Sequence, residues 1–249
     1  IENYPLYKKS EKQGNYRTFM WQSVYGADCY FQPNENVEDP VLRKIFQDVR
    51  FRRALSLAID REEVNEAIYF GLGVPRQLTF IPQCSYYEEK FARAHAEYNP
   101  GEAARLLDEI GLEWDENHEY RLRPDGKRLA AILEFYDAAA VYVSGNELVR
   151  EHWKKVGFDL ILKGESGSLL SQRNAGNQLQ VGQCSQTGGD YDFFTEAANC
   201  FVPMGHCWIT DFAPLWTDWY LTKGEKGEEP PEEVKKNLAG LTKLEKRMV

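Results

Sequence analysis

Three carboxylates follow a pair of glycines in the long segment 186–214, which has neither helical nor strand periodicity. Asp190, Asp192 and Glu196 come directly after Gly188-Gly189. Two carboxylates held about 5–10 Å apart could hydrolyse a glycosidic bond. A single carboxylate beside glycines could instead accept hydrogen bonds from the amine or hydroxyl groups of a ligand. A turn with exposed acids is the third interpretation, because the whole chain is acidic.

Large aromatic side chains follow these carboxylates at close spacing. Trp208 precedes a group formed by Trp216, Trp219 and Tyr220. On a helix, the last three share one face. They either pack the domain together or form a platform on which a sugar or a peptide stacks.

Signatures of a serine nucleophile and of a zinc site nearly match and fail. Residues 164–168 read Gly-Glu-Ser-Gly-Ser, whereas a nucleophile elbow needs glycine in the last position, and no histidine stands nearby. Cys184, Cys200, His206 and Cys207 do not have the spacing of a zinc finger or ribbon. We therefore predict no catalytic residue, no metal and no cofactor.

Charge and composition narrow the function further. The 249 residues carry 30 basic and 39 acidic side chains, a net charge of -9. That balance argues against a nucleic-acid partner and against docking on anionic membranes. No apolar run approaches the roughly 20 residues of a membrane span. The five cysteines are odd in number and irregularly spaced, so they do not indicate a disulfide framework.

The elements that must position these residues alternate between strand and helix. Such alternation implies crossover connections and a mixed, partly parallel sheet with flanking helices, an α/β fold. In chain order the predicted elements are a strand Leu129–Tyr136, a helix Asn146–Val156, a strand Phe158–Leu162, a helix Leu169–Asn174 and a strand Leu179–Gln183.

The first half of the chain is predicted to be largely helical. Capping residues place helix starts after Asp48, Asp60 and Asn99. The remaining predictions are strands at Tyr16–Ser23 and Cys29–Gln32, a loop at Pro33–Pro40, a helix at Ser85–Glu97, and a hairpin that pairs Tyr120–Arg123 with Leu129–Tyr136.

Four segments in matching order resemble one known family. Residues 48–63 (DVRFRRALSLAIDREE) resemble the signature helix pair of the family 5 extracellular solute-binding proteins of ABC importers. Residues 30–34, 98–107 and 151–158 resemble further segments of that family, so the resemblance covers nearly the whole chain.

The resemblance implies one lobe of a two-lobed fold of the type II periplasmic-binding-protein kind. Residues 1–222 would be the second, ligand-binding lobe, and residues 223–249 a linker and partial helix returning toward the first lobe. Both ends look cut from a longer protein. The implied function is non-catalytic and extracytoplasmic: a peptide or an oligosaccharide is captured between the lobes and delivered to a membrane permease.

The resemblance also implies a binding site. In peptide-binding relatives, an Asp in a W-x-x-D-Y stretch holds the amino terminus of the ligand, and Gly189-Asp190-Tyr191 occupies the comparable place, without the Trp. The expected ligand-binding residues are Asp190, Tyr191, Trp208, Trp216 and Trp219. The alternatives are a carbohydrate-active hydrolase that uses Asp190 and Glu196, and a module that binds a protein partner.

Overall fold

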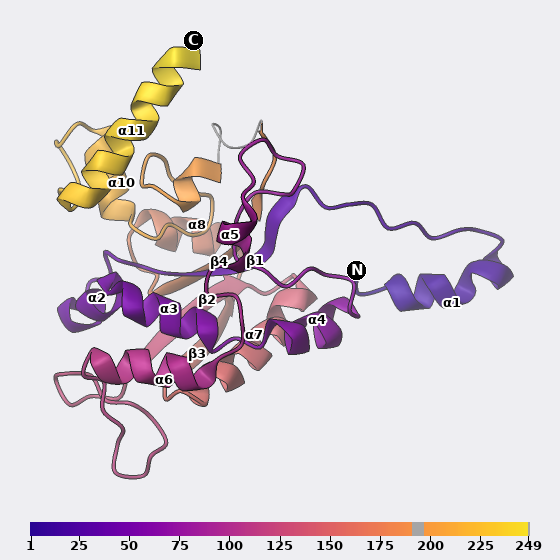
Figure 1. Cartoon of the computed structure of the whole chain (residues 1–249), viewed down its shortest axis with the longest axis horizontal. Coiled ribbons are helices and arrows are strands. Elements are labelled where there is room, and N and C mark those ends of the chain that lie inside the picture. Colours follow the sequence, from indigo (N-terminus) through magenta and orange to yellow (C-terminus); the bar gives the residue numbers. More distant parts are fainter. Residues whose placement is uncertain (191–196, 249) are drawn as a thin grey trace.

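A four-stranded mixed sheet carries the fold, with helices on both of its faces (Figure 1). The computed structural model describes residues 1–190 and 197–248. The strand order is β1-β4-β2-β3; β2 runs parallel to β3 and β4, whereas β1 runs antiparallel to β4. This arrangement confirms the predicted partly parallel α/β sheet. The strands are β1 (Tyr25–Pro33), β2 (Ala130–Tyr136), β3 (Asp159–Glu165) and β4 (Val181–Thr187).

Two crossover helices join the parallel strands, as the alternating pattern predicts. Helix α7 (Ala140–Lys154) connects β2 to β3, and α8 (Gly167–Ala175) connects β3 to β4. Alternate residues of β2 face opposite sides of the sheet. Leu133 faces the main core, where it packs with side chains of α7, whereas Glu134 is buried on the other face and pairs with Arg173 of α8.

The main core lies between the sheet and three helices whose starts are capped by side chains. These are α2 (Pro40–Gln47), α3 (Val49–Leu57) and α6 (Pro100–Glu109). Asp48 accepts a hydrogen bond from the Arg50 N–H at 2.8 Å, and Asn99 accepts one from the Glu102 N–H at 3.0 Å. The side chains that fill this core include Phe46, Phe51, Leu107, Leu133, Trp153 and Phe158.

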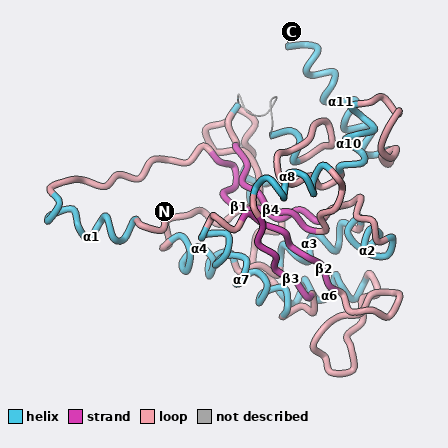
Figure 2. The backbone as a smooth tube through the Cα atoms, turned by 180° about the vertical axis from the view of Figure 1, so that it is seen from behind, coloured by secondary structure: helices cyan, strands magenta, loops and turns pink. Residues whose placement is uncertain are grey.

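The other helices surround this centre. Figures 1 and 2 show α1 and the extended segment that leads to β1 standing away from the sheet. The remaining elements are α1 (Tyr4–Gly14), α4 (Arg61–Tyr69), α5 (Glu89–Arg93), the 3-10 turn Ala197–Cys200, α10 (Pro214–Leu221) and α11 (Glu232–Met248).

Several predicted elements are wrong or incomplete. The segment Tyr16–Ser23 pairs with no strand in the described part of the chain, and Trp21 within it is 91% exposed. The helix predicted over Ser85–Glu97 is limited to α5. Helix α2 begins at Pro40, where a loop was expected to end, because Asp39 accepts hydrogen bonds from the N–H groups of its first turn.

The predicted hairpin is also wrong, because β2 takes its partners from β3 and β4. A single antiparallel bridge, Leu122 with Arg128, remains of it. The turn between them is present, since the Gly126 N–H donates to the Arg123 carbonyl at 2.9 Å. The turn predicted at residues 124–126 is therefore confirmed. The parallel partners of β2 lie too far along the chain for a local turn pattern to predict them.

A fully buried arginine joins α6 to the end of α7. The Arg121 guanidinium donates to the Val156 carbonyl at 2.9 Å, to the Asp108 carboxylate at 2.6 Å and to the Leu112 carbonyl. Gly157, at φ +86°, lies directly against it: a Cβ there would stand 2.6 Å from the Arg121 Cγ and 2.9 Å from the Trp114 ring. This position therefore requires glycine for two reasons, the backbone angle and the space.

Gly157→Ala should destabilise the protein more than Gly126→Ala, although both glycines have positive φ, +86° and +76°. A Cβ on Gly126 meets nothing within 4 Å, so only backbone strain of about 1 kcal/mol applies there. Overpacking adds to that strain at Gly157, and we expect a loss of about 3 kcal/mol. Urea denaturation measures both variants. Equal losses would show that the Arg121 packing is not tight.

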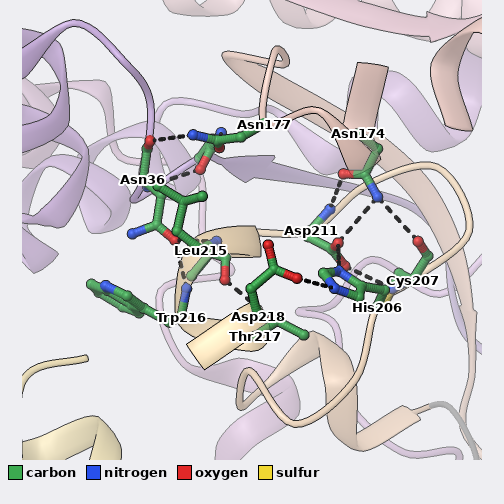
Figure 3. Close-up of polar contacts among 12 residues, drawn as sticks. Asn36, Asn174, Asn177, His206, Cys207, Asp211, Leu215, Trp216, Thr217 and Asp218 are labelled. Atoms are coloured by element: carbon green, nitrogen blue, oxygen red, sulfur yellow. Dashed lines mark hydrogen bonds and ion pairs between the residues drawn. The ribbon is translucent and has the colours of Figure 1, made fainter. Parts of the chain in front are cut away.

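An asparagine far along the sequence caps α10. The Asn36 Oδ1 accepts hydrogen bonds from the N–H groups of Leu215 and Trp216, at 3.0 and 3.2 Å (Figure 3). The local cap residue, Ala213, offers no side-chain hydrogen bond. The position of α10 therefore depends on the segment that follows β1, because unpaired N–H groups at a helix start need an acceptor.

The segment before α10 is held by Asp211, a carboxylate that is only 6% exposed. It accepts hydrogen bonds from the Cys207 N–H at 2.7 Å and from the Asn174 amide at 3.1 Å. His206 lies between this carboxylate and Asp218, with its Nδ1 2.7 Å from the former and its Nε2 3.2 Å from the latter (Figure 3). The hydrogen bond to Asp211, with support from Asp218, raises the pKa of His206 above its ordinary value.

We expect the contacts of His206 with Asp211 and Asp218 to make the stability of the fold depend on pH. A raised folded-state pKa means that the contribution is fully present below the unfolded-state pKa of about 6.5 and is lost as the pH rises through the folded-state value. Urea denaturation between about pH 6 and pH 8.5 should show a falling stability. The fall should be shallower in Asp218→Asn and shallowest in His206→Gln. An unchanged slope in His206→Gln would contradict this assignment.

Candidate functional site

The carboxyl ends of three strands meet at one edge of the sheet. β2, β3 and β4 are parallel and end at Tyr136, Glu165 and Thr187, and the antiparallel β1 begins beside them at Tyr25. We call this the carboxyl edge. In open α/β sheets, ligands bind outside such an edge.

Three stretches of backbone meet at the carboxyl edge without side chains between them. The Gly188 N–H donates to the Val24 carbonyl at 2.9 Å, and the Ile81 N–H donates to the Gly188 carbonyl at 3.0 Å. A Cβ on Gly26 would stand 1.9 Å from the Thr79 carbonyl oxygen, and a Cβ on Gly188 would stand 2.8 Å from the Gly26 Cα. Because any Cβ here would separate the backbones, this glycine junction fixes the positions of the residues next to it.

Asp190 follows the junction directly and is held by the turn at Cys84 and Ser85. Its Oδ1 accepts three hydrogen bonds: from the Cys84 Sγ at 2.9 Å, from the Ser85 N–H at 2.7 Å and from the Ser85 hydroxyl at 2.8 Å. These donors, the Cys84 thiol first, hold the pKa of Asp190 below its ordinary range. Within residues 1–190 and 197–248, no hydrogen bond reaches its Oδ2. An ionised carboxylate is therefore fixed in place with one oxygen available to a ligand.

Trp208 lies at the same edge, beside the start of α8. It is 65% exposed, and the tip of its indole lies 3.1 Å from the place that a Cβ on Gly167 would occupy, at the start of α8. Tyr136, the last residue of β2, lies beside the same glycine. The structure thus places two of the predicted ligand-binding residues, Asp190 and Trp208, at the carboxyl edge.

The aromatic residues of α10 lie elsewhere. Asn36, which caps α10, follows the end of β1, and that end pairs with the first residue of β4. The length of β4, about 20 Å for seven residues, separates this place from Asp190. Trp216 is 4% exposed, and Trp219 is half-buried beneath the turn at Gly224. The structure does not bring these two residues together with Asp190, and their role in binding stays a prediction.

The predicted residues Tyr191, Asp192 and Glu196 lie outside the described residues. A hollow of about 1460 Å³ runs along β1, from Tyr25 at the carboxyl edge to Pro33 at the opposite end, and involves residues that the sequence did not single out as a site. Its wall includes Trp21, Tyr25, Arg76, Ile81, Pro82 and Phe201. Asp190 does not line the hollow, but the Cys84-Ser85 turn that binds Asp190 begins two residues after the lining residue Pro82.

The residues weighed as a nucleophile or as zinc ligands have structural partners. Ser166 caps α8, accepting a hydrogen bond from the Leu169 N–H at 3.4 Å. His206 is held by two carboxylates, and the sulfurs of Cys200 and Cys207 lie 4.0 Å apart. Over the described ranges, no three His, Cys, Asp or Glu side chains are grouped so that they could hold a metal ion. No helix in those ranges has the length and apolarity that a membrane span requires.

The chain is similar to known solute-binding proteins both in sequence and in fold. The oligopeptide-binding protein AppA of Bacillus subtilis (strain 168) is 28% identical over 172 residues, which are 69% of this chain and 30% of AppA. The structure of an oligopeptide-binding protein OppA matches with a TM-score of 0.79 and 32% identity, over 94% of this chain and 38% of OppA.

A third match is to the fold alone. The periplasmic binding protein MelB from Agrobacterium fabrum C58, solved in complex with stachyose, matches with a TM-score of 0.67 at 16% identity, over 84% of this chain and 33% of MelB. The chain thus spans about a third of the length of these relatives.

The family assignment rests on most of the chain. The family model described as bacterial extracellular solute-binding proteins, family 5 middle, matches residues 2–204. These residues include the capped helices α3, α4 and α6, the whole sheet and the glycine junction. The chain belongs to the family 5 bacterial extracellular solute-binding proteins.

Proposed function

We propose that this chain is the ligand-contacting lobe of the solute-binding component of an ABC importer. It holds a peptide or an oligosaccharide between two lobes outside the cytoplasm and passes it to a membrane permease without changing it. The observation that carries this proposal is Asp190, an ionised carboxylate at the carboxyl edge with one oxygen left for a ligand. Residues 1–222 supply this lobe, and residues 223–249 lead toward the other one.

Three donors on Oδ1 prepare the Asp190 carboxylate for binding. Because the side chain is already fixed, little conformational entropy is lost when a ligand group bonds to Oδ2. A ligand amine or hydroxyl there makes a charge-assisted hydrogen bond. When the other lobe closes over the edge, it excludes water, and the lower local dielectric strengthens the same bond.

The two classes of ligand use different parts of the edge. A peptide with a free amino terminus offers Asp190 a cation, as the names of AppA and OppA suggest for those proteins. An oligosaccharide offers hydroxyl groups and the flat face of a ring. The exposed indole of Trp208 provides a surface on which such a ring stacks. MelB, which shares this fold, was solved with the oligosaccharide stachyose bound.

The hydrolase alternative has less support. It needs a second carboxylate at a set distance from Asp190 across the substrate, and its candidate, Glu196, lies outside the described residues. The three protein donors on the Asp190 Oδ1 stabilise the ionised form of this carboxyl group, which disfavours a role as a general acid. None of the relatives described above is named as an enzyme.

Asp190→Ala should weaken binding of a peptide that has a free amino terminus by about 2–4 kcal/mol, because the amine loses its charged partner. Calorimetry on the protein with both lobes measures this. Glu116→Ala is the matched control, since Glu116 is an exposed carboxylate in the loop before β2, at the opposite edge of the sheet, and should leave the affinity unchanged. Ser85→Ala, which removes one positioning donor, should fall between the two. An Asp190→Ala variant that binds like the control would refute the proposed contact.

Trp208→Ala separates the two ligand classes. If a sugar ring stacks on the indole, the variant should lose about 1–2 kcal/mol of oligosaccharide affinity and retain peptide affinity. Titration with a peptide and with its N-acetylated form completes the comparison, because acetylation removes the charge that Asp190 binds. Equal affinity for both peptides, together with full oligosaccharide affinity in Trp208→Ala, would show that neither residue contacts the ligand.

A further inference from the structure

Two cysteine side chains separated by six residues lie close together beside the end of β4. The Cys200 Sγ, at the end of the 3-10 turn, lies 4.0 Å from the Cys207 Sγ. Neither cysteine is part of a disulfide in the structure. A disulfide has a sulfur–sulfur distance of about 2.05 Å, so the two sulfurs would have to approach by about 2 Å to form one.

The surroundings hold both cysteines in place. The Cys200 Sγ is buried and donates to the Gln186 Oε1 at 3.0 Å, and the Tyr30 hydroxyl lies 3.3 Å from the same sulfur. The Cys207 N–H donates to Asp211, so its backbone is anchored as well. Cys207 is half-buried as a residue, whereas Cys200 is buried, so Cys207 is the more accessible of the pair.

We propose that Cys200 and Cys207 form a disulfide when the protein reaches an oxidising compartment. The extracytoplasmic location is part of the proposed function, and only the occurrence of the reaction in the cell rests on it. The pairing itself rests on the 4.0 Å approach of the two sulfurs and on the contacts that hold the Cys200 sulfur and the Cys207 backbone. The sequence does not predict this pairing, because its five cysteines are odd in number and irregularly spaced.

The oxidant is a small-molecule disulfide, written RSSR. The Cys207 thiolate attacks one of its sulfurs, the S–S bond breaks, and the first RS⁻ leaves and takes up a proton. The Cys200 thiolate then attacks the Cys207 sulfur of the mixed disulfide, and the second RS⁻ leaves and is protonated. Two protein thiols are oxidised to one disulfide, and one RSSR is reduced to two RSH.

The bond would tie the chain that follows Asp190 to the body of the lobe. The 3-10 turn Ala197–Cys200 would be joined through Cys207 to Asp211, which is itself bonded to α8 through Asn174. A covalent tie of this kind restricts the unfolded chain and stabilises the folded one.

Peptide mapping after oxidation tests the pairing. The purified chain is incubated overnight with oxidised glutathione, its remaining thiols are alkylated, and it is cleaved with chymotrypsin, which cuts after Phe201 between the two cysteines. A long incubation is needed because the hydrogen bond with Cys200, and then burial, raise the pKa of the Cys207 thiol. We expect a linked pair of peptides containing Cys200 and Cys207, and a melting temperature about 5 °C above that of the reduced chain.

Matched serine variants identify the partners. Cys184→Ser should still form the linked pair, whereas Cys200→Ser should retain a free or glutathione-bound Cys207 and lose the thermal shift. Full alkylation of both cysteines after oxidation of the wild-type chain, or a link from either one to Cys184, would overturn the proposal. These readouts involve no solute, so a failure of the proposed binding function would leave them unaffected.

Discussion

The contact of three backbones at Gly26, Gly188 and the Thr79–Ile81 stretch is the constraint on which the candidate site depends. Two glycines allow the start of β1, the end of β4 and a distant loop to approach within hydrogen-bonding distance. The same loop continues into the Cys84-Ser85 turn that binds Asp190. The close backbone contact at the two glycines sets the position of this turn. The turn in turn fixes the Asp190 carboxylate and supplies the donors that favour its ionised form.

A second set of polar contacts, at the other end of β4, divides the aromatic residues into two groups. Asn36 caps α10 from outside, and Asp211 holds the segment before it against α8. These contacts place Trp216 in the interior and leave Trp208 exposed near the carboxyl edge. One end of the lobe is thus built for packing, while the other presents a charge and an aromatic surface.

The sequence predicted what depends on local interactions. Asp48, Asp60 and Asn99 cap the helices that they were expected to cap, because a cap acts within three residues, and alternating strands and helices predicted the parallel part of the sheet. Long-range contacts were out of reach. The partners of Asp190 lie over a hundred residues away, and Tyr16–Ser23 has the pattern of a strand without a partner that makes it one. Trp208 and Trp216 look alike in sequence, but Trp216 is buried and Trp208 exposed, and the Asn36 side chain that caps the helix of Trp216 lies 180 residues before it.

A crystal structure of the protein with both lobes, in complex with its solute, tests the central claim most directly. The claim is that the glycine junction presents Asp190 to a ligand at the carboxyl edge. The account predicts a solute enclosed between the lobes, with an amine or hydroxyl group within about 3 Å of the Asp190 Oδ2 and with Oδ1 still bonded to Ser85. A solute bound against α10, with Asp190 in contact only with protein or water, would contradict it.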